Sequence, residues 1–238
     1  MNVSKKKPAR QVNNPGHDFS LNSGERQTGI NLADIRYDHK VRYDFSINYI
    51  KDNLADDQSY FGLDIFCGTG YGTYMFSNSL KCPMLGIDGS EDAVAFANTH
   101  YQNEQTLYAH KLFPFELPAE TFNFITCYES LEHVDAAAFF IKQLTGALKK
   151  NGFLFLSVPN QSYWPHSKEL NPFHVRHYSM EELKTLISET AGLELKIWLG
   201  QNLYERCDGK SIIPLPEDKM GLVKSQEGQI LVYAFYKR

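Results

Sequence analysis

The most informative stretch of this 238-residue chain is Leu63-Asp64-Ile65-Phe66-Cys67-Gly68-Thr69-Gly70-Tyr71-Gly72. A short apolar run ends in glycines at alternate positions, and a helical pattern follows from about Tyr71. Glycine lets the backbone pass close to a ligand, and the first turn of a helix offers free N–H groups. The stretch therefore predicts a strand, a ligand-binding turn and a helix in succession.

Apolar runs alternate with helical patterns along most of the remaining chain. Strands are predicted at 60–66, 84–87, 106–110, 122–128, 152–158, 193–199 and 230–236, and helices at 35–54, 90–100, 135–149 and 179–191. Such alternation favours an α/β fold, here a Rossmann-like seven-stranded, mostly parallel sheet with helices on both faces. The segment 201–227 is predicted to be a long loop, which makes the C-terminal strand antiparallel to its predecessor.

Length and composition set the domain organisation. We expect a polar tail or cap over residues 1–30 and a single domain over 31–238. That domain begins with a helical cap and carries insertions at 159–178 and 201–227.

The charge and the cysteines limit the classes of partner and location. The formal charge of −4 disfavours nucleic acid and anionic lipid as partners. The four cysteines form no CxxC pair, which disfavours a disulfide framework or a cysteine zinc site. No apolar run approaches the roughly 20 residues of a membrane span, and no signal peptide is recognisable. We expect a cytoplasmic monomer or homodimer.

Two acids near the glycine turn narrow the ligand class. Asp64 lies just before the turn, where a carboxylate would repel a pyrophosphate but suit an amine. Asp88 ends the next strand, where an acid accepts hydrogen bonds from ribose hydroxyls. A ligand with a ribose and an amine but no phosphate is S-adenosylmethionine. The alternative is a simple tight turn with Asp88 as a strand-end cap.

On these motifs the chain resembles the class I S-adenosylmethionine-dependent methyltransferases, from about residue 35 to the C-terminus. Residues 64–72 resemble the family's first motif, and Asp88 resembles its ribose acid. Residues 122–134 and 148–159 resemble its fourth-strand motif and its fifth strand. The resemblance implies methyl transfer from S-adenosyl-L-methionine, with S-adenosyl-L-homocysteine as the product.

A narrower resemblance concerns the acceptor. Gly24-Glu25-Arg26, Arg42-Tyr43 and Asn171-Pro172-Phe173-His174-Val175-Arg176 resemble a bacterial subgroup linked with O-antigen or capsule synthesis. This implies O-methylation of a saccharide or nucleotide-linked sugar. The alternatives are a methyltransferase for a phenol, quinone precursor or amine, and a catalytically silent cofactor-binding subunit. A nicotinamide dehydrogenase is disfavoured by the GxGxG spacing.

The cofactor contacts follow from the sheet topology. Ligands of open parallel sheets bind beyond the carboxyl ends of the strands. Asp64 is expected to support the loop and the cofactor ammonium, Asp88 to bind the ribose, and Arg42 to meet the cofactor carboxylate. The full set of predicted cofactor residues is Asp64, Cys67, Gly68, Gly70, Asp88, Gly89, Ser90, Cys127 and Tyr128, with Arg42, Tyr43 and Leu112.

The acceptor side is predicted from histidines and aromatic residues. His133 and His174 are candidate general bases, because imidazole titrates near neutral pH; packing or capping roles are the alternatives. Tyr163, Trp164 and His177 are candidate acceptor contacts within an aromatic insertion. Magnesium-dependent members need clustered acids near the acceptor. The sequence offers no convincing cluster of that kind, so we expect no metal.

Overall fold

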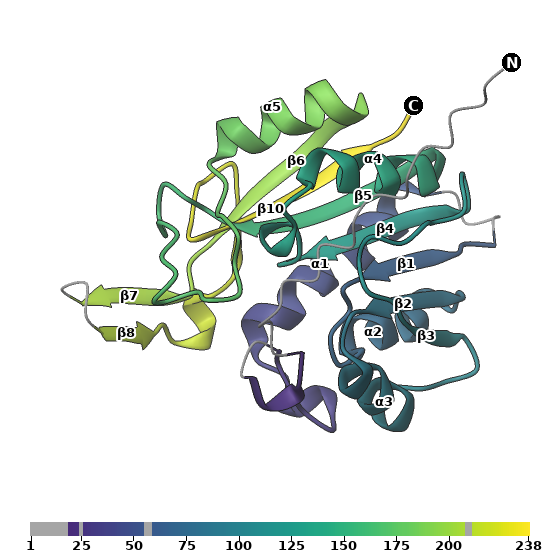
Figure 1. Ribbon diagram of the computed structural model, residues 1–238, viewed down its shortest axis with the longest axis horizontal. Coiled ribbons are helices and arrows are strands. Elements are labelled where there is room, and N and C mark those ends of the chain that lie inside the picture. The colour runs from purple at the N-terminus through teal and green to yellow at the C-terminus, as the bar shows by residue number, and fades with distance from the viewer. Residues whose placement is uncertain (1–18, 24–25, 55–58, 208–210) are drawn as a thin grey trace, which may run out of the picture.

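The computed structural model describes residues 19–23, 26–54, 59–207 and 211–238 (Figure 1). Its centre is an eight-stranded sheet with the order β3-β2-β1-β4-β5-β10-β6-β9. The strands are β1 (Gly62–Ile65), β2 (Met84–Asp88), β3 (Thr106–His110), β4 (Phe122–Tyr128), β5 (Leu148–Pro159), β6 (Glu194–Gln201), β9 (Leu222–Lys224) and β10 (Ile230–Tyr236). β1 to β5 pair in parallel, whereas β10 is antiparallel to both β5 and β6. The predicted fold class is confirmed, with one strand more than expected.

Helices cover both faces of the sheet and divide the core into two layers. The helices are α1 (Tyr37–Asn53), α2 (Tyr71–Leu80), α3 (Glu91–His100), α4 (Ala137–Ala147) and α5 (Met180–Ala191). α1, α2 and α3 pack their apolar side chains with one face of the strands, and α4 and α5 pack with the other. Strand residues of β4 are buried throughout, as expected for a central strand of a parallel sheet.

Two helix starts follow the predicted capping chemistry. The Ser90 hydroxyl accepts a hydrogen bond from Ala93 N at 3.1 Å and opens α3. Ser179 and Glu182 form a reciprocal capping box at the start of α5. α5 ends at Ala191, and Gly192 follows it with φ of +60°, the left-handed conformation that glycine favours.

The helix predicted at 135–149 is shorter than expected. α4 ends at Ala147, and residues 148–151 already belong to β5. The reason is tertiary pairing: Asn151 N donates to Lys237 O at 2.8 Å, so this backbone is held by the C-terminal end of the sheet. Asn151 adopts φ of +62° within the strand instead of ending a helix.

The prediction of a long loop over 201–227 is wrong. The segment contains a two-stranded antiparallel pair, β7 (Tyr204–Cys207) and β8 (Ser211–Pro214), and the edge strand β9. Buried amide side chains order it. The Gln201 side chain donates to Asp38 O and Met220 O, and Gln229 Oε1 accepts from two backbone N–H groups.

The described part of the N-terminal region lies against the glycine turn. Thr69 Oγ1 donates to Gln27 O at 2.9 Å, and the Tyr101 hydroxyl donates to Gly29 O at 2.7 Å. Residues 1–18, Gly24 and Glu25 lie outside the described residues. The segment from Arg26 to Gly29 is therefore part of the wall around the turn, at the carboxyl ends of the strands.

Three cysteines, Cys67, Cys82 and Cys127, are buried free thiols. The Cys207 side chain lies outside the part of the chain that the structure describes. In that same part, no helix has both the length and the apolar character needed to cross a membrane.

Candidate active site

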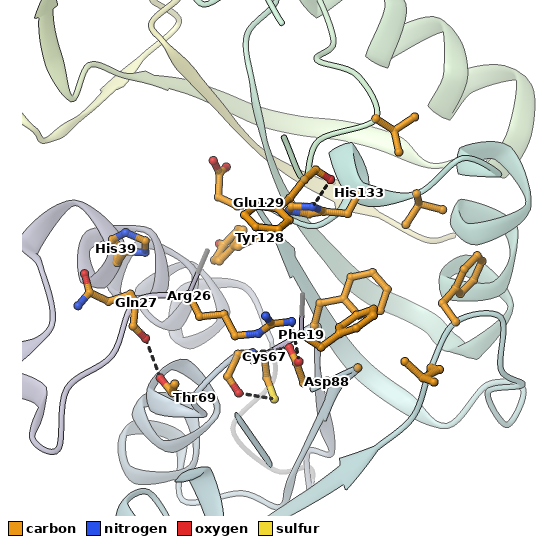
Figure 2. A pocket seen from close by; sticks show the side chains of 18 of the residues that line it. Phe19, Arg26, Gln27, His39, Cys67, Thr69, Asp88, Tyr128, Glu129 and His133 are labelled. Atoms are coloured by element: carbon orange, nitrogen blue, oxygen red, sulfur yellow. Dashed lines mark hydrogen bonds and ion pairs between the residues drawn. The ribbon is translucent and has the colours of Figure 1, made fainter. Parts of the chain in front are cut away.

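A cavity of about 750 Å³ opens beyond the carboxyl ends of the parallel strands (Figure 2). Residues that follow β1, β2, β3 and β4 line it, together with parts of α1 and the segments around Arg26 and Phe173. The predicted cofactor residues in its wall are Arg42, Tyr43, Cys67, Gly68, Asp88, Gly89, Leu112 and Tyr128. The structure thus brings most of the predicted set to one cavity.

Two glycines in the turn have different surroundings. Gly68 has φ of +55° and lines the cavity, and a methyl group there would meet no atom within 4 Å. Gly70 has φ of +87°, and a methyl group there would lie 2.6 Å from the Ala97 Cβ and 2.8 Å from the Tyr108 ring. Gly68 therefore keeps the ligand side of the turn open, whereas Gly70 allows the turn to pack on α3 and β3.

Asp88 is the organising acid of the cavity. Its carboxylate accepts hydrogen bonds from Gly68 N at 2.9 Å and Ser90 N at 2.8 Å. The Arg26 guanidinium forms an ion pair with it at 3.1 Å, and the Asp88 side chain is only 3% exposed. We did not predict the Arg26 contact, although Arg26 belongs to a motif that the sequence singled out. Ser90 itself lies behind Asp88, outside the cavity wall.

Asp64 lies behind the wall instead of on it. Its carboxylate accepts hydrogen bonds from Thr73 Oγ1 and Thr126 Oγ1, both at 2.8 Å, and so ties β1 to α2 and β4. Burial raises its pKa to about 6, against the three hydroxyl groups that lower it. This geometry supports the predicted role in holding the loop and leaves direct contact with a ligand to other groups.

A positively charged and a negatively charged side chain lie together at the end of the cavity between α1 and β4. Arg42 Nη1 lies 3.3 Å from Glu129 Oε1, which also accepts a hydrogen bond from Ser157 Oγ at 2.7 Å. Burial raises the pKa of Glu129, and the Arg42 charge opposes this. The Tyr128 hydroxyl donates to Arg42 O at 3.2 Å. The rule that ligands bind beyond the strand ends predicts Glu129 near the cofactor, because it follows the fourth strand, but it predicts no role for this residue.

The two candidate bases differ in position. His133 lines the cavity, and His174 lies beside it with ring centroids 4.8 Å apart. Burial and the neighbouring histidines lower the pKa of His174 to about 3, which makes it a weak proton acceptor.

Two predicted cofactor residues, Cys127 and Gly70, lie outside the cavity wall, and Cys127 is fully buried in the core.

The predicted acceptor contacts Tyr163, Trp164 and His177 do not reach this cavity. Backbone hydrogen bonds from residues 163 and 164 to Asn160 O fold the segment into a tight turn. Tyr163 is consequently exposed, and Trp164 packs edge-on against Tyr204 at 5.2 Å. The cavity instead receives Lys168, Phe173 and Val175 from the same insertion.

The sequence that forms this sheet, glycine turn and pair of acids matches a known protein family. A family model described as a methyltransferase domain matches residues 37–196. The chain belongs to that family, and its sheet has the fold of known methyltransferases.

The curated relatives agree with this assignment. A probable S-adenosylmethionine-dependent methyltransferase of Mycolicibacterium smegmatis is 29% identical over 140 residues, which is 58% of this chain and 53% of that protein. A ubiquinone biosynthesis O-methyltransferase of Hydrogenovibrio crunogenus is 33% identical over 108 residues, 42% of this chain and 43% of that protein. The chain spans about half the length of the curated relatives it matches.

The fold is also found in solved structures. A Thermotoga maritima protein described as a possible histamine N-methyltransferase superposes with a TM-score of 0.56 at 23% identity, covering 84% of this chain and 92% of that one. A Mesorhizobium loti S-adenosylmethionine-dependent methyltransferase gives 0.59 at 14% identity, covering 81% and 99%. At this level of identity the likeness shows the fold alone.

The cavity fits the cofactor of this family. A buried carboxylate at the end of β2 and an open glycine beside it suit a ribose that approaches the backbone closely. Arg42 and Glu129 present a positive and a negative group side by side, matching the carboxylate and ammonium of an amino acid. When bound, S-adenosylmethionine supplies an activated methyl group, and the protein supplies position and shielding.

Proposed function

We propose that this methyltransferase transfers the methyl group to a hydroxyl of a small acceptor, foremost a saccharide or nucleotide-linked sugar used in surface-glycan synthesis. The observation that carries the proposal is the continuity of the cavity. One space of about 750 Å³ runs from Asp88 past Tyr128 to His133. That volume is typical of small-molecule sites and leaves room for an acceptor beside the cofactor.

In this proposal the residues at the cofactor end of the cavity hold the cofactor in the orientation that methyl transfer requires. Asp88 holds the ribose, Arg42 and Glu129 hold the amino-acid group, and Leu112 covers the adenine. Methyl transfer is an in-line displacement, so the acceptor oxygen must lie opposite the departing sulfur. Holding two reactants in that geometry contributes up to about 7–11 kcal/mol in ideal cases.

The sugar acceptor is supported by the sequence resemblance, in particular by Arg26 and residues 171–176. Arg26 and Val175 both line the cavity, so residues from both motifs contribute to its wall. A sugar nucleotide also suits the mildly acidic chain better than a polyanion does, because the formal charge is −4.

A phenol or quinone precursor is the second candidate, and the lining favours it. The cavity wall includes Phe113, Phe139, Phe173 and Val175, which suit an aromatic or prenylated acceptor. Several curated relatives are named ubiquinone biosynthesis O-methyltransferases. Their name says nothing directly about this chain, but it makes phenols the second class to test.

The experiment is a methyl-transfer screen with labelled S-adenosylmethionine over nucleotide sugars, free saccharides and substituted phenols. We expect label transfer to at least one hydroxyl acceptor and none to the matching deoxy or methoxy compounds. Asp88→Ala serves as the control that loses cofactor binding. Transfer only to amines, or no transfer to any acceptor while the cofactor binds, would overturn the O-methyltransferase proposal.

A further inference from the structure

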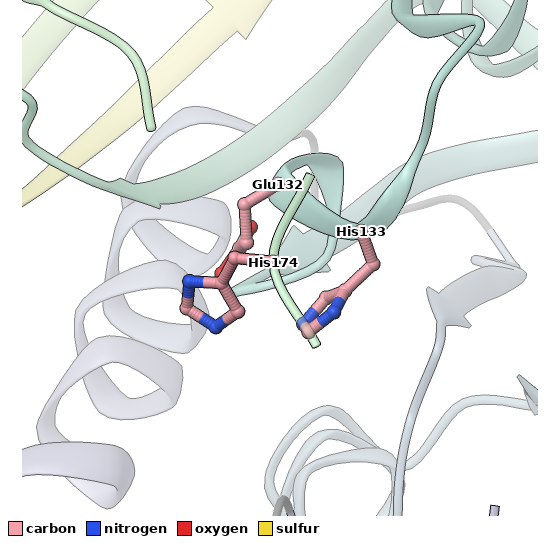
Figure 3. Close-up of side chains that lie close together, drawn as sticks. All are labelled: Glu132, His133 and His174. Carbon is pink, nitrogen blue, oxygen red and sulfur yellow. The ribbon is translucent and has the colours of Figure 1, made fainter. Parts of the chain in front are cut away.

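Figure 3 shows three side chains with metal-binding chemistry that lie close together. Glu132 and His133 come from the short helix at Leu131–His133 that follows β4, and His174 comes from the insertion after β5. One possible ligand atom from each residue lies within 4.8 Å of the others. His133 also lines the cavity, so the cluster borders the space proposed for the acceptor.

The backbone holds the two segments of the cluster together. Val175 N donates to Glu132 O at 2.7 Å, which joins the insertion to the short helix. The His133 ring nitrogen Nδ1 lies 3.1 Å from Phe173 O. One contact is backbone to backbone and the other is side chain to backbone, and they flank His174 in the sequence, so they hold the His174 backbone next to the other two residues.

The hydrogen bonds of the histidines determine which nitrogen carries the proton. His177 Nδ1 lies 2.6 Å from Trp164 O, and a carbonyl only accepts, so His177 Nδ1 is the donor. Neutral His177 then accepts through Nε2 from His174 Nδ1 at 2.7 Å. The same reasoning makes His133 Nδ1 a donor to Phe173 O. In the neutral form that a metal ligand requires, His133 and His174 therefore both carry the lone pair on Nε2.

This arrangement is the one that metal-binding histidines use. A ligating imidazole is neutral and donates its other N–H to a carbonyl or another fixed acceptor, which sets the tautomer and the ring orientation. His177 then acts as the outer partner that orients His174.

Glu132 brings a negative charge into the same place. Its side chain is fully buried, and it supplies a carboxylate, which transition-metal ions accept as a ligand together with imidazole nitrogens. Two imidazole nitrogens and one carboxylate favour an ion of the Zn²⁺ class over Mg²⁺ or Ca²⁺, which prefer oxygen ligands.

We propose that Glu132, His133 and His174 form a site for a divalent transition-metal ion of the Zn²⁺ class at the acceptor end of the cavity. Three protein ligands leave a coordination position for a substrate oxygen. This revises the expectation of no metal, which rested on the lack of clustered acids for Mg²⁺. The ligands here are mainly histidines, and they are brought together from positions 41 residues apart, so spacing alone does not reveal them.

The consequence for the acceptor rests on the proposed function. A bound divalent ion lowers the pKa of a hydroxyl that coordinates it. The hydroxyl proton would pass to solvent, and the oxygen would form its bond to the methyl carbon as the carbon–sulfur bond breaks, leaving a neutral thioether. The site thereby favours an acceptor with a hydroxyl that coordinates a metal, and His174 would act as a ligand instead of a base.

The test uses Co²⁺ as a spectroscopic probe for Zn²⁺. Purified protein is stripped with a chelator and titrated with Co²⁺, and the visible absorption and the stoichiometry are measured. We expect one equivalent to bind with the intense band of a low-coordinate nitrogen-ligated ion, and excess Zn²⁺ to displace it. His133→Ala and His174→Ala should each lose the band, whereas His100→Ala, on an exposed helix end, should keep it.

A conservative variant separates a metal site from a structural cluster. His177→Phe keeps the ring volume but removes the acceptor for His174 Nδ1, and should weaken binding about 10–100-fold. In the wild type, Zn²⁺ should raise the melting temperature by an amount that grows with its concentration. A wild-type protein without the Co²⁺ band, or a His174→Ala variant with an unchanged band, would overturn the proposal.

The same samples distinguish the two proposals. S-adenosylmethionine binding is titrated calorimetrically with and without Zn²⁺. Cofactor binding and methyl transfer without metal binding would refute the metal site and leave the proposed function standing. Metal binding without methyl transfer to any hydroxyl acceptor would refute the proposed function and leave the metal site standing.

Discussion

The two left-handed glycines of the turn allow a paired test of how the cofactor loop is built. Alanine at either position incurs the cost of a left-handed conformation, about 1–2 kcal/mol. At Gly68 the added methyl group meets no atom within 4 Å and points into the cavity. At Gly70 it would lie 2.6 Å from the Ala97 Cβ, which adds the cost of overpacking, about 1–3 kcal/mol.

These costs translate into different melting temperatures. For a chain of this size, about 1 kcal/mol corresponds to about 2–4 °C. We therefore expect Gly68→Ala to lower the melting temperature by about 2–8 °C, and Gly70→Ala, at about 2–5 kcal/mol, by about 4–20 °C. Thermal unfolding followed by circular dichroism gives both values.

The loss of cofactor affinity should rank the two variants in the opposite order to the loss of stability. Calorimetric titration at a temperature where both variants are folded should find the larger loss of affinity in Gly68→Ala, because its methyl group occupies the space that the cofactor approaches. Equal losses of stability in the two variants, or unchanged cofactor affinity in Gly68→Ala, would refute the assignment of one glycine to packing and the other to the ligand.

Three further predictions concern the acids and the cap around the turn. Asp88→Ala should weaken S-adenosylmethionine binding about 10- to 150-fold, as loss of one hydrogen bond to a charged group implies; calorimetric affinity within twofold of the wild type would contradict the ribose assignment. Burial raises the Asp64 pKa from 3.8 to about 6, so the folded state favours its protonated form. Ionisation of this carboxyl therefore costs stability as the pH rises from 3.8 to about 6, by about 3 kcal/mol. Over that window, urea unfolding should show Asp64→Asn gaining on the wild type, and a pH-independent difference would argue against the raised pKa. Ser90→Ala removes the cap of α3 and should cost about 1 kcal/mol, or about 2–4 °C in melting temperature, whereas Thr99→Ala on the exposed side of the same helix should not.

Local patterns predicted the features that local physics controls. The caps at Ser90 and Ser179 depend on contacts three residues away, and both are present. The strands at 106–110 and 122–128 have the predicted bounds, because their apolar runs end at polar or turn residues. The strand predicted at 152–158 begins earlier, at Leu148, and residues 148–151 were missed because a pairing partner, Lys237, lies far along the chain.

The candidate site likewise contains features that the sequence predicted and contacts that it did not. The glycine turn and Asp88 follow strand ends, so the topology rule places them correctly. The Arg26–Asp88 ion pair joins residues 62 positions apart, and no local pattern encodes such a contact. The many aromatic residues of the insertion at 159–178 predicted contacts with the acceptor. Composition does not show in which direction the backbone turns place each ring, and the ring of Trp164 lies outside the cavity.

The position of β10 in the sheet has a consequence for synthesis. β10 lies between β5 and β6, and its residues are almost completely buried. A ribosome delivers the chain from its N-terminus, so β5 is complete long before Ile230–Tyr236 emerges. During that interval the apolar edge of β5 is open to strands from other nascent chains. Completion of the sheet is therefore a late event in the biogenesis of each molecule, and the interval before it is when aggregation competes with folding.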